Sequence, residues 1–156
     1  MRHPFKIHAL QSAPFHALFD KTDAELDALG VVRMESDGAS PCRVSLADAP
    51  SGSKIFLLNF VHHDVTSPYR AAGPIFVEAG AETAEFEVGQ VPDMLRKRLL
   101  SVRGYDAVGM MVEATVVEGV ELAATIQACY DQASVSYLHI HFARPGCYAC
   151  RVERAG

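Results

Sequence analysis

The stretch YLHIHFARPGCYACRV, residues 137–152, contains two of the seven histidines and two of the four cysteines of the chain. Apolar and polar side chains alternate on both sides of a break at Arg144-Pro145-Gly146. Alternation with a period of two is typical of β-strands, and the proline and glycine are typical of a turn. We therefore predict two strands that pair as a hairpin.

The length of the hairpin loop determines which side chains share a face, because a shift of one residue exchanges the two faces of a strand. A three-residue loop would put four polar residues on one face, opposite the apolar ones: His139, His141, Cys147 and Arg151. A two-residue or four-residue loop would instead place Tyr148 and Cys150 beside the histidines. The three-residue loop is favoured here, because it buries more apolar surface and Gly146 suits its left-handed final position.

The composition is that of one folded domain spanning residues 1–156, with 49% hydrophobic and 21% charged residues. A net charge of -5 disfavours binding to nucleic acid, which depends on a basic surface. The chain lacks the apolar run of a signal peptide and any segment able to span a bilayer. We therefore expect a cytoplasmic protein, with no nucleic-acid or membrane partner and with its cysteines as free thiols.

Most of the other periodic stretches predict strands. In the strand predicted from Pro41 to Leu46, Arg43 alternates with apolar residues and should face the solvent. The nearly apolar stretch Lys54 to Val61 predicts a central strand, which leads into a polar loop from His62 to Gly73 that suits a site. Further extended segments are predicted at residues 5–10, 74–77, 84–88, 105–106 and 110–117.

Three stretches predict helices. Thr22-Asp23-Ala24-Glu25 has the form of a capping box, and Gly30 is placed to end that helix. Pro92 suits the first turn of a second helix, and residues 119–130 predict a third. Because the helices do not alternate regularly with the strands, the predicted fold is α+β, a single domain with a mainly antiparallel sheet.

Several segments together resemble a bacterial family catalogued as domain of unknown function 1203. They are PCRVSL at 41–46, LLNF with the following His62, SPYR at 67–70, PIFV at 74–77, YDAVGMMV at 105–112 and YLHIHFARPGCYACRV at 137–152. The resemblance implies a single-domain protein without an established activity. It also implies a set of family-like polar positions: His62, Tyr69, Arg70, His139, His141, Arg144, Cys147 and Tyr148.

The leading functional hypothesis is a small anionic ligand in a pocket between the loop 62–70 and the hairpin. Arginine binds carboxylate and phosphate groups in a bidentate manner, and both segments contain arginine. The predicted ligand-binding residues are His62, Tyr69, Arg70, Arg144 and Tyr148. If the protein is an enzyme, His139 and His141 are the predicted general acid or base, and Cys147 is a candidate nucleophile.

The alternative hypothesis is a metal site on His139 and His141. Two residues that are two apart on a strand project from the same face, about 6.6 Å apart at their backbones. Zinc would require further ligands, for which Cys147 and His62 are the candidates. The sequence alone identifies no cofactor.

A third hypothesis is a non-catalytic interaction module. The polar residues would then serve an interface, for example in a homodimer. In that case each arginine would be a surface group or would pair with a nearby carboxylate, for which Asp64, Asp106 and Glu153 are candidates.

Overall fold

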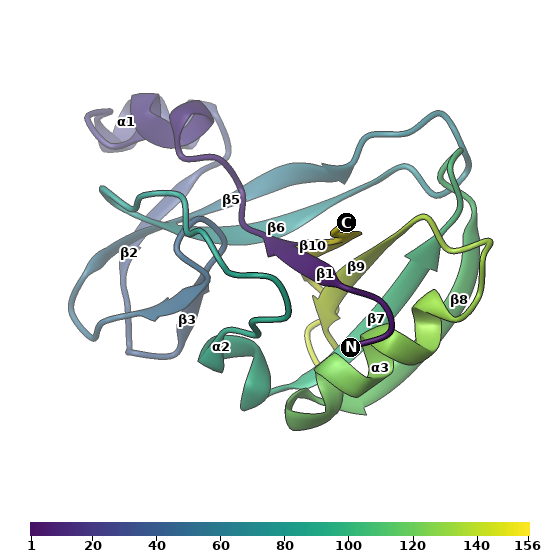
Figure 1. The fold of residues 1–156 in the computed structure, drawn as a ribbon. Coiled ribbons are helices and arrows are strands. Elements are labelled where there is room, and N and C mark those ends of the chain that lie inside the picture. The colour runs from purple at the N-terminus through teal and green to yellow at the C-terminus, as the bar shows by residue number, and fades with distance from the viewer.

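The chain forms two five-stranded sheets and a few short helices in the computed structural model, which describes residues 1–156 (Figure 1). The first sheet has the strand order β1 (Phe5–His8), β10 (Tyr148–Arg154), β9 (Tyr137–Phe142), β7 (Leu99–Tyr105) and β8 (Met111–Glu118). The second has the order β2 (Val32–Glu35), β5 (Lys54–His63), β6 (Ala71–Glu78), β3 (Ser40–Cys42) and β4 (Ala47–Ala49). Only β3 and β6 pair in parallel, so the predicted α+β class with mainly antiparallel pairing is confirmed.

The helices are α1 (Asp23–Ala28), α2 (Asp93–Arg96) and α3 (Leu122–Tyr130), with 3-10 turns at Ala13–Leu18 and Gly119–Glu121. The predicted capping box is confirmed, because the Thr22 side chain accepts from the Glu25 N–H and the Glu25 carboxylate accepts from the Thr22 N–H. Gly30 follows this helix with a φ of 71°, a conformation that glycine adopts without steric cost.

The main core lies between α3 and one face of the first sheet, where the two run side by side (Figure 1). Leu122 and Ile126 of α3 belong to the same buried cluster as Leu138 and Ile140 of β9. Successive side chains of a strand point to opposite faces. The histidines of β9 are therefore turned away from α3, and their rings meet side chains of β5 from the second sheet.

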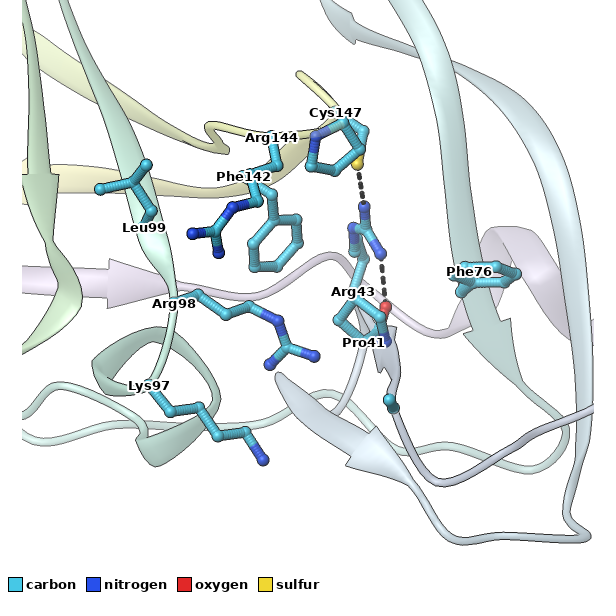
Figure 2. A pocket seen from close by; sticks show the side chains of 11 residues that line it. Pro41, Arg43, Phe76, Lys97, Arg98, Leu99, Phe142, Arg144 and Cys147 are labelled. Carbon is cyan, nitrogen blue, oxygen red and sulfur yellow. Dashed lines mark hydrogen bonds between the residues drawn. The ribbon is translucent and has the colours of Figure 1, made fainter.

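The predicted strand from Pro41 to Leu46 is wrong, because β3 ends at Cys42 and the chain turns before β4 begins. The alternation ends with the strand, and Arg43, predicted to face the solvent, is only 1% exposed. Its guanidinium donates to the carbonyl oxygen of Tyr148. It also donates to the carbonyl oxygen of Pro41 and contacts the Cys147 sulfur at 3.1 Å (Figure 2).

The central position predicted for the strand at Lys54 to Val61 is confirmed, since β5 lies between β2 and β6. The following loop is shorter than predicted, because β5 continues to His63 and β6 already begins at Ala71. The strand predicted at residues 84–88 is absent. There the N–H groups of Ala84 and Gly89 bond to two separate segments rather than along one ladder.

Candidate functional site

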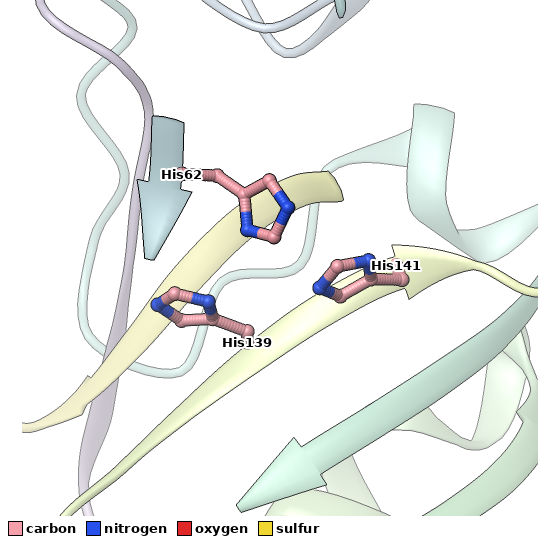
Figure 3. A group of neighbouring side chains, drawn as sticks. All are labelled: His62, His139 and His141. Atoms are coloured by element: carbon pink, nitrogen blue, oxygen red, sulfur yellow. The ribbon is translucent and has the colours of Figure 1, made fainter. Parts of the chain in front are cut away.

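Three histidines converge between the two sheets, His62 from β5 and His139 and His141 from β9 (Figure 3). One ring nitrogen from each residue lies within 4.8 Å of those of the other two. His139 and His141 are each 1% exposed, whereas His62 is partly exposed. The structure thus places His62, one of the two further ligands suggested by the sequence, beside the predicted pair His139 and His141.

A β-bulge in β5 positions His62. Val61 pairs with Ala72 and His63 pairs with Ala71, so His62 is the extra residue between two neighbouring pairs. In a regular strand adjacent side chains point to opposite faces, but a bulge re-aims one of them. Here His62 and His63 both approach His139, with ring centroids 6.3 Å and 4.9 Å from it.

A second bulge lies in the hairpin formed by β9 and β10. Away from the loop the pairing is the one predicted for a three-residue loop, with Leu138 opposite Val152 and Ile140 opposite Cys150. The register then shifts between Tyr148 and Cys150, so that Tyr148 lies opposite His141. The favoured prediction is therefore correct in the middle of the hairpin and wrong at its loop end.

The shift also moves Cys147 away from the histidines. The Phe142 N–H donates to the Cys147 carbonyl oxygen at 2.9 Å, which leaves the four-residue loop 143–146 between them. The prediction that Cys147 shares the histidine face is wrong, because its sulfur lies against Arg43. Tyr148 takes that place, and its ring stacks on His62 at 5.1 Å between centroids.

Each of the three histidines has a buried ring nitrogen without a hydrogen-bond partner: His62 Nδ1, His139 Nδ1 and His141 Nε2. In His141 the other nitrogen, Nδ1, lies 3.0 Å from the Gly146 carbonyl oxygen. That oxygen accepts only, so Nδ1 carries the proton and Nε2 keeps a lone pair. Burying a polar group without a partner costs about 1–3 kcal/mol, and here three such groups are gathered at one place.

Burial keeps these rings neutral. Desolvation, with the positive charge of neighbouring groups, lowers the pKa of His62 to about 4, that of His139 to about 2 and that of His141 to about 3. The lowered pKa values favour the neutral imidazole over the imidazolium form at neutral pH. The neutral form is the one that donates a lone pair to a metal ion.

His63 has a structural role that the sequence did not indicate. Its Nδ1 donates to the Tyr69 carbonyl oxygen at 2.8 Å, and its Nε2 accepts from the Tyr137 hydroxyl at 2.6 Å. Both ring nitrogens are thus partnered, in contrast to those of His62. Tyr137 is two residues from His139 on β9 and so lies on the same strand face, but no local pattern in the sequence links it to β5.

The predicted ligand-binding residues do not form one pocket. Tyr69 is 38% exposed. Arg70 is also exposed and forms an ion pair with Asp64, one of the carboxylates that the third hypothesis named as partners of the arginines. Arg144 and Cys147 line a different cavity, whose walls include no histidine. Only His62 and Tyr148 of the predicted set lie at the histidine cluster.

The fold and this cluster define a small α+β protein with three clustered imidazoles between two sheets, those of His139 and His141 buried and that of His62 partly exposed. The chain belongs to the family described as protein of unknown function (DUF1203), whose model matches residues 39–154, so the resemblance is confirmed. Comparisons with curated proteins and with solved structures found no match. None of the helices has the length and apolar character needed to cross a membrane.

Proposed function

We propose that this protein binds a divalent transition-metal ion through His62, His139 and His141. The observation that carries the proposal is that three histidines converge on one place and that each has a buried ring nitrogen without a hydrogen-bond partner (Figure 3). A metal ion would accept a lone pair from each of them and remove the cost of leaving them unsatisfied.

The donor set supports a transition metal rather than calcium or magnesium. Imidazole nitrogen suits zinc, copper, nickel and iron, whereas calcium and magnesium require oxygen ligands. No carboxylate or thiolate belongs to the cluster. In a tetrahedral zinc site the nitrogens would lie about 3.3 Å apart, so modest rotations of the rings would close the separation of at most 4.8 Å.

The hydrogen bond from His141 to Gly146 supports the same role. Histidines that bind metals commonly donate their other N–H to a carbonyl or carboxylate, which orients the ring and makes the ligand more basic. Tyr148, stacked on His62, restricts the orientation of a second ring. Three ligands leave a fourth position open for water or a small ligand, and a metal at such a site acts as a Lewis acid.

The proposal is tested by elemental analysis of protein purified without an affinity tag, before and after reloading with Zn²⁺ or Co²⁺. We expect about one ion per chain, and we expect it to be lost in His62→Gln, His139→Gln and His141→Gln. The matched control is His16→Gln, because His16 is exposed and outside the cluster. Circular dichroism verifies that each variant is folded.

Two results would contradict the metal site. One is wild-type protein that takes up neither ion. The other is folded cluster variants that retain as much metal as the His16 control. The expectations of a cytoplasmic location, no nucleic-acid partner and a homodimer stay predictions.

A further inference from the structure

A cavity of about 330 Å³ is lined in part by the hairpin (Figure 2). Phe142 lines it, and the side chain of Phe142 points to the opposite face of β9 from that of His141, so the cavity lies on the other side of the hairpin from the histidine cluster. Its walls come from β3 and the residues on either side of it, the segment from the end of α2 to the start of β7, β6, β9 and the hairpin loop. Four of the lining residues are cationic, and none is acidic: Arg43, Lys97, Arg98 and Arg144. A volume of this size is at the lower end of the range for small-molecule sites.

Carboxylates balance only part of this charge. Asp48 accepts from Arg98 at 2.7 Å and from Lys97 at 2.6 Å, so one carboxylate serves two cations. Arg43 and Arg144 form no ion pair. The cavity therefore has an excess of positive charge.

Arg43 makes this excess unusual, because its side chain is buried. Buried charges are normally paired, since removing an ion from water costs several kcal/mol. Arg43 bonds to two carbonyl oxygens and the Cys147 sulfur, none of which is a carboxylate. Burial, together with repulsion from Arg98, lowers its pKa, so an anion in the cavity would stabilise the charged form.

An aromatic ring lies among these cations. The guanidinium carbon of Arg43 is 4.9 Å from the centre of the Phe142 ring, and that of Arg98 is 5.3 Å from it. Arg144 of the hairpin loop lines the same cavity (Figure 2). Phe76 and Leu99 add further apolar wall, so the cavity offers both a cationic and an apolar surface.

We infer that this cavity binds a small molecule with a phosphate or carboxylate head group and an apolar body. The head group lies among Arg43, Arg98 and Arg144, and the body lies on the ring of Phe142. This site has different walls from the pocket predicted from the sequence, because Arg70 and the histidines are not part of it. It is also independent of the metal proposed for the histidine cluster.

The inference is tested by isothermal titration calorimetry of the full chain with phenyl phosphate and with benzoate, which share a ring and differ in their head group. Benzyl alcohol is the neutral control. We expect saturable binding of at least one anion, none of benzyl alcohol, and a weakening with added NaCl. The tighter of the two anions identifies the head group as phosphate or carboxylate.

The variants are Arg144→Gln, at an exposed residue that bonds no other side chain, and Arg98→Gln. Loss of a charged hydrogen bond weakens binding by about tenfold or more, and we expect this in both variants. The matched control is Arg70→Gln, which removes an exposed arginine outside the cavity and should bind as the wild type does.

Cys147 provides an independent readout of where the probe binds. It lines the cavity and is the only one of the four cysteines that is partly exposed rather than buried. A bound probe should slow its alkylation by iodoacetamide at least severalfold. The inference is overturned if neither anion binds, if benzyl alcohol binds equally well, or if binding survives Arg144→Gln and leaves Cys147 unprotected.

Discussion

The Nδ1 of His141 lies 3.0 Å from the carbonyl oxygen of Gly146, and this hydrogen bond connects the histidine cluster to the hairpin loop. The residues on either side of Gly146, Pro145 and Cys147, line the cationic cavity on the other side of the hairpin. One short loop therefore contributes to both proposed sites. Its conformation should affect the histidine cluster directly.

Gly146→Ala should lower both stability and metal affinity. Gly146 has a φ of 83°, where an alanine costs about 1 kcal/mol, although nothing lies within 4 Å of the added Cβ. Any shift of its carbonyl weakens the hydrogen bond that orients His141, and loss of such a bond typically lowers metal affinity about tenfold or more.

Gly52→Ala is the matched control for this change. Gly52 has a φ of 86° with open space around it, in a turn before β5. It should show a similar loss of stability by urea denaturation and unchanged zinc affinity by competition with a chelator. Equal zinc affinities in the two variants would show that the loop carbonyl does not orient the ligand.

Tyr137→Phe should destabilise the fold without removing the metal. It deletes the hydroxyl that lies 2.6 Å from His63 Nε2 and leaves that buried nitrogen unpaired, at a cost of about 1–3 kcal/mol. Urea denaturation measures the loss, and Tyr69→Phe, at an exposed tyrosine, is the control with little effect. If the Tyr137→Phe variant instead bound no metal, His63 would be part of the metal site.

Arg43→Lys should be strongly destabilising despite the retained charge. A lysine amine lacks the planar set of donors that reaches the Tyr148 carbonyl, the Pro41 carbonyl and the Cys147 sulfur together. We expect a loss of about 2 kcal/mol or more in the free energy of unfolding.

The control for Arg43 is Arg33→Lys. Arg33 forms an ion pair with the exposed Asp23, so the same substitution there should cost about 0.5 kcal/mol or less. Thermal and urea denaturation of both variants provides the comparison. Similar losses of stability at the two positions would mean that the hydrogen bonds of the Arg43 guanidinium stabilise the fold no more than an exposed ion pair does.

The metal-free protein should lose stability as the pH falls below about 6.5. Burial lowers the pKa of His139 to about 2, so between that pH and the unfolded value near 6.5 only the unfolded chain binds the proton. Acid therefore favours unfolding, by up to about 1.4 kcal/mol per pH unit for this residue.

Urea denaturation in EDTA at pH 7, 6 and 5 measures this effect. His139→Gln should reduce the dependence on pH, with the remainder due to His62 and His141, whose pKa values are also lowered. His16→Gln, at an exposed histidine, should leave the dependence as in the wild type. Parallel curves for the wild type and His139→Gln would show that folding does not lower the pKa of His139.

Local patterns predicted much of the fold. The capping box beginning at Thr22 specified α1, and the apolar run from Lys54 specified the central strand of the second sheet. These features depend on neighbours within one or two turns or on strand alternation, which a sequence records directly. The strand predicted around Arg43 failed, because the turn that ends β3 buries that residue against the distant Tyr148 and Cys147.

The sequence by itself determined that His139 and His141 share a strand face, because the period of two is a property of the extended backbone. Only the tertiary structure decided which residues join them. Bulges in β5 and β10 brought in His62 and Tyr148 and sent Cys147 to the cationic cavity. A bulge changes the direction of a side chain without changing the composition of the strand, so the partners of a strand face depend on pairing between distant segments.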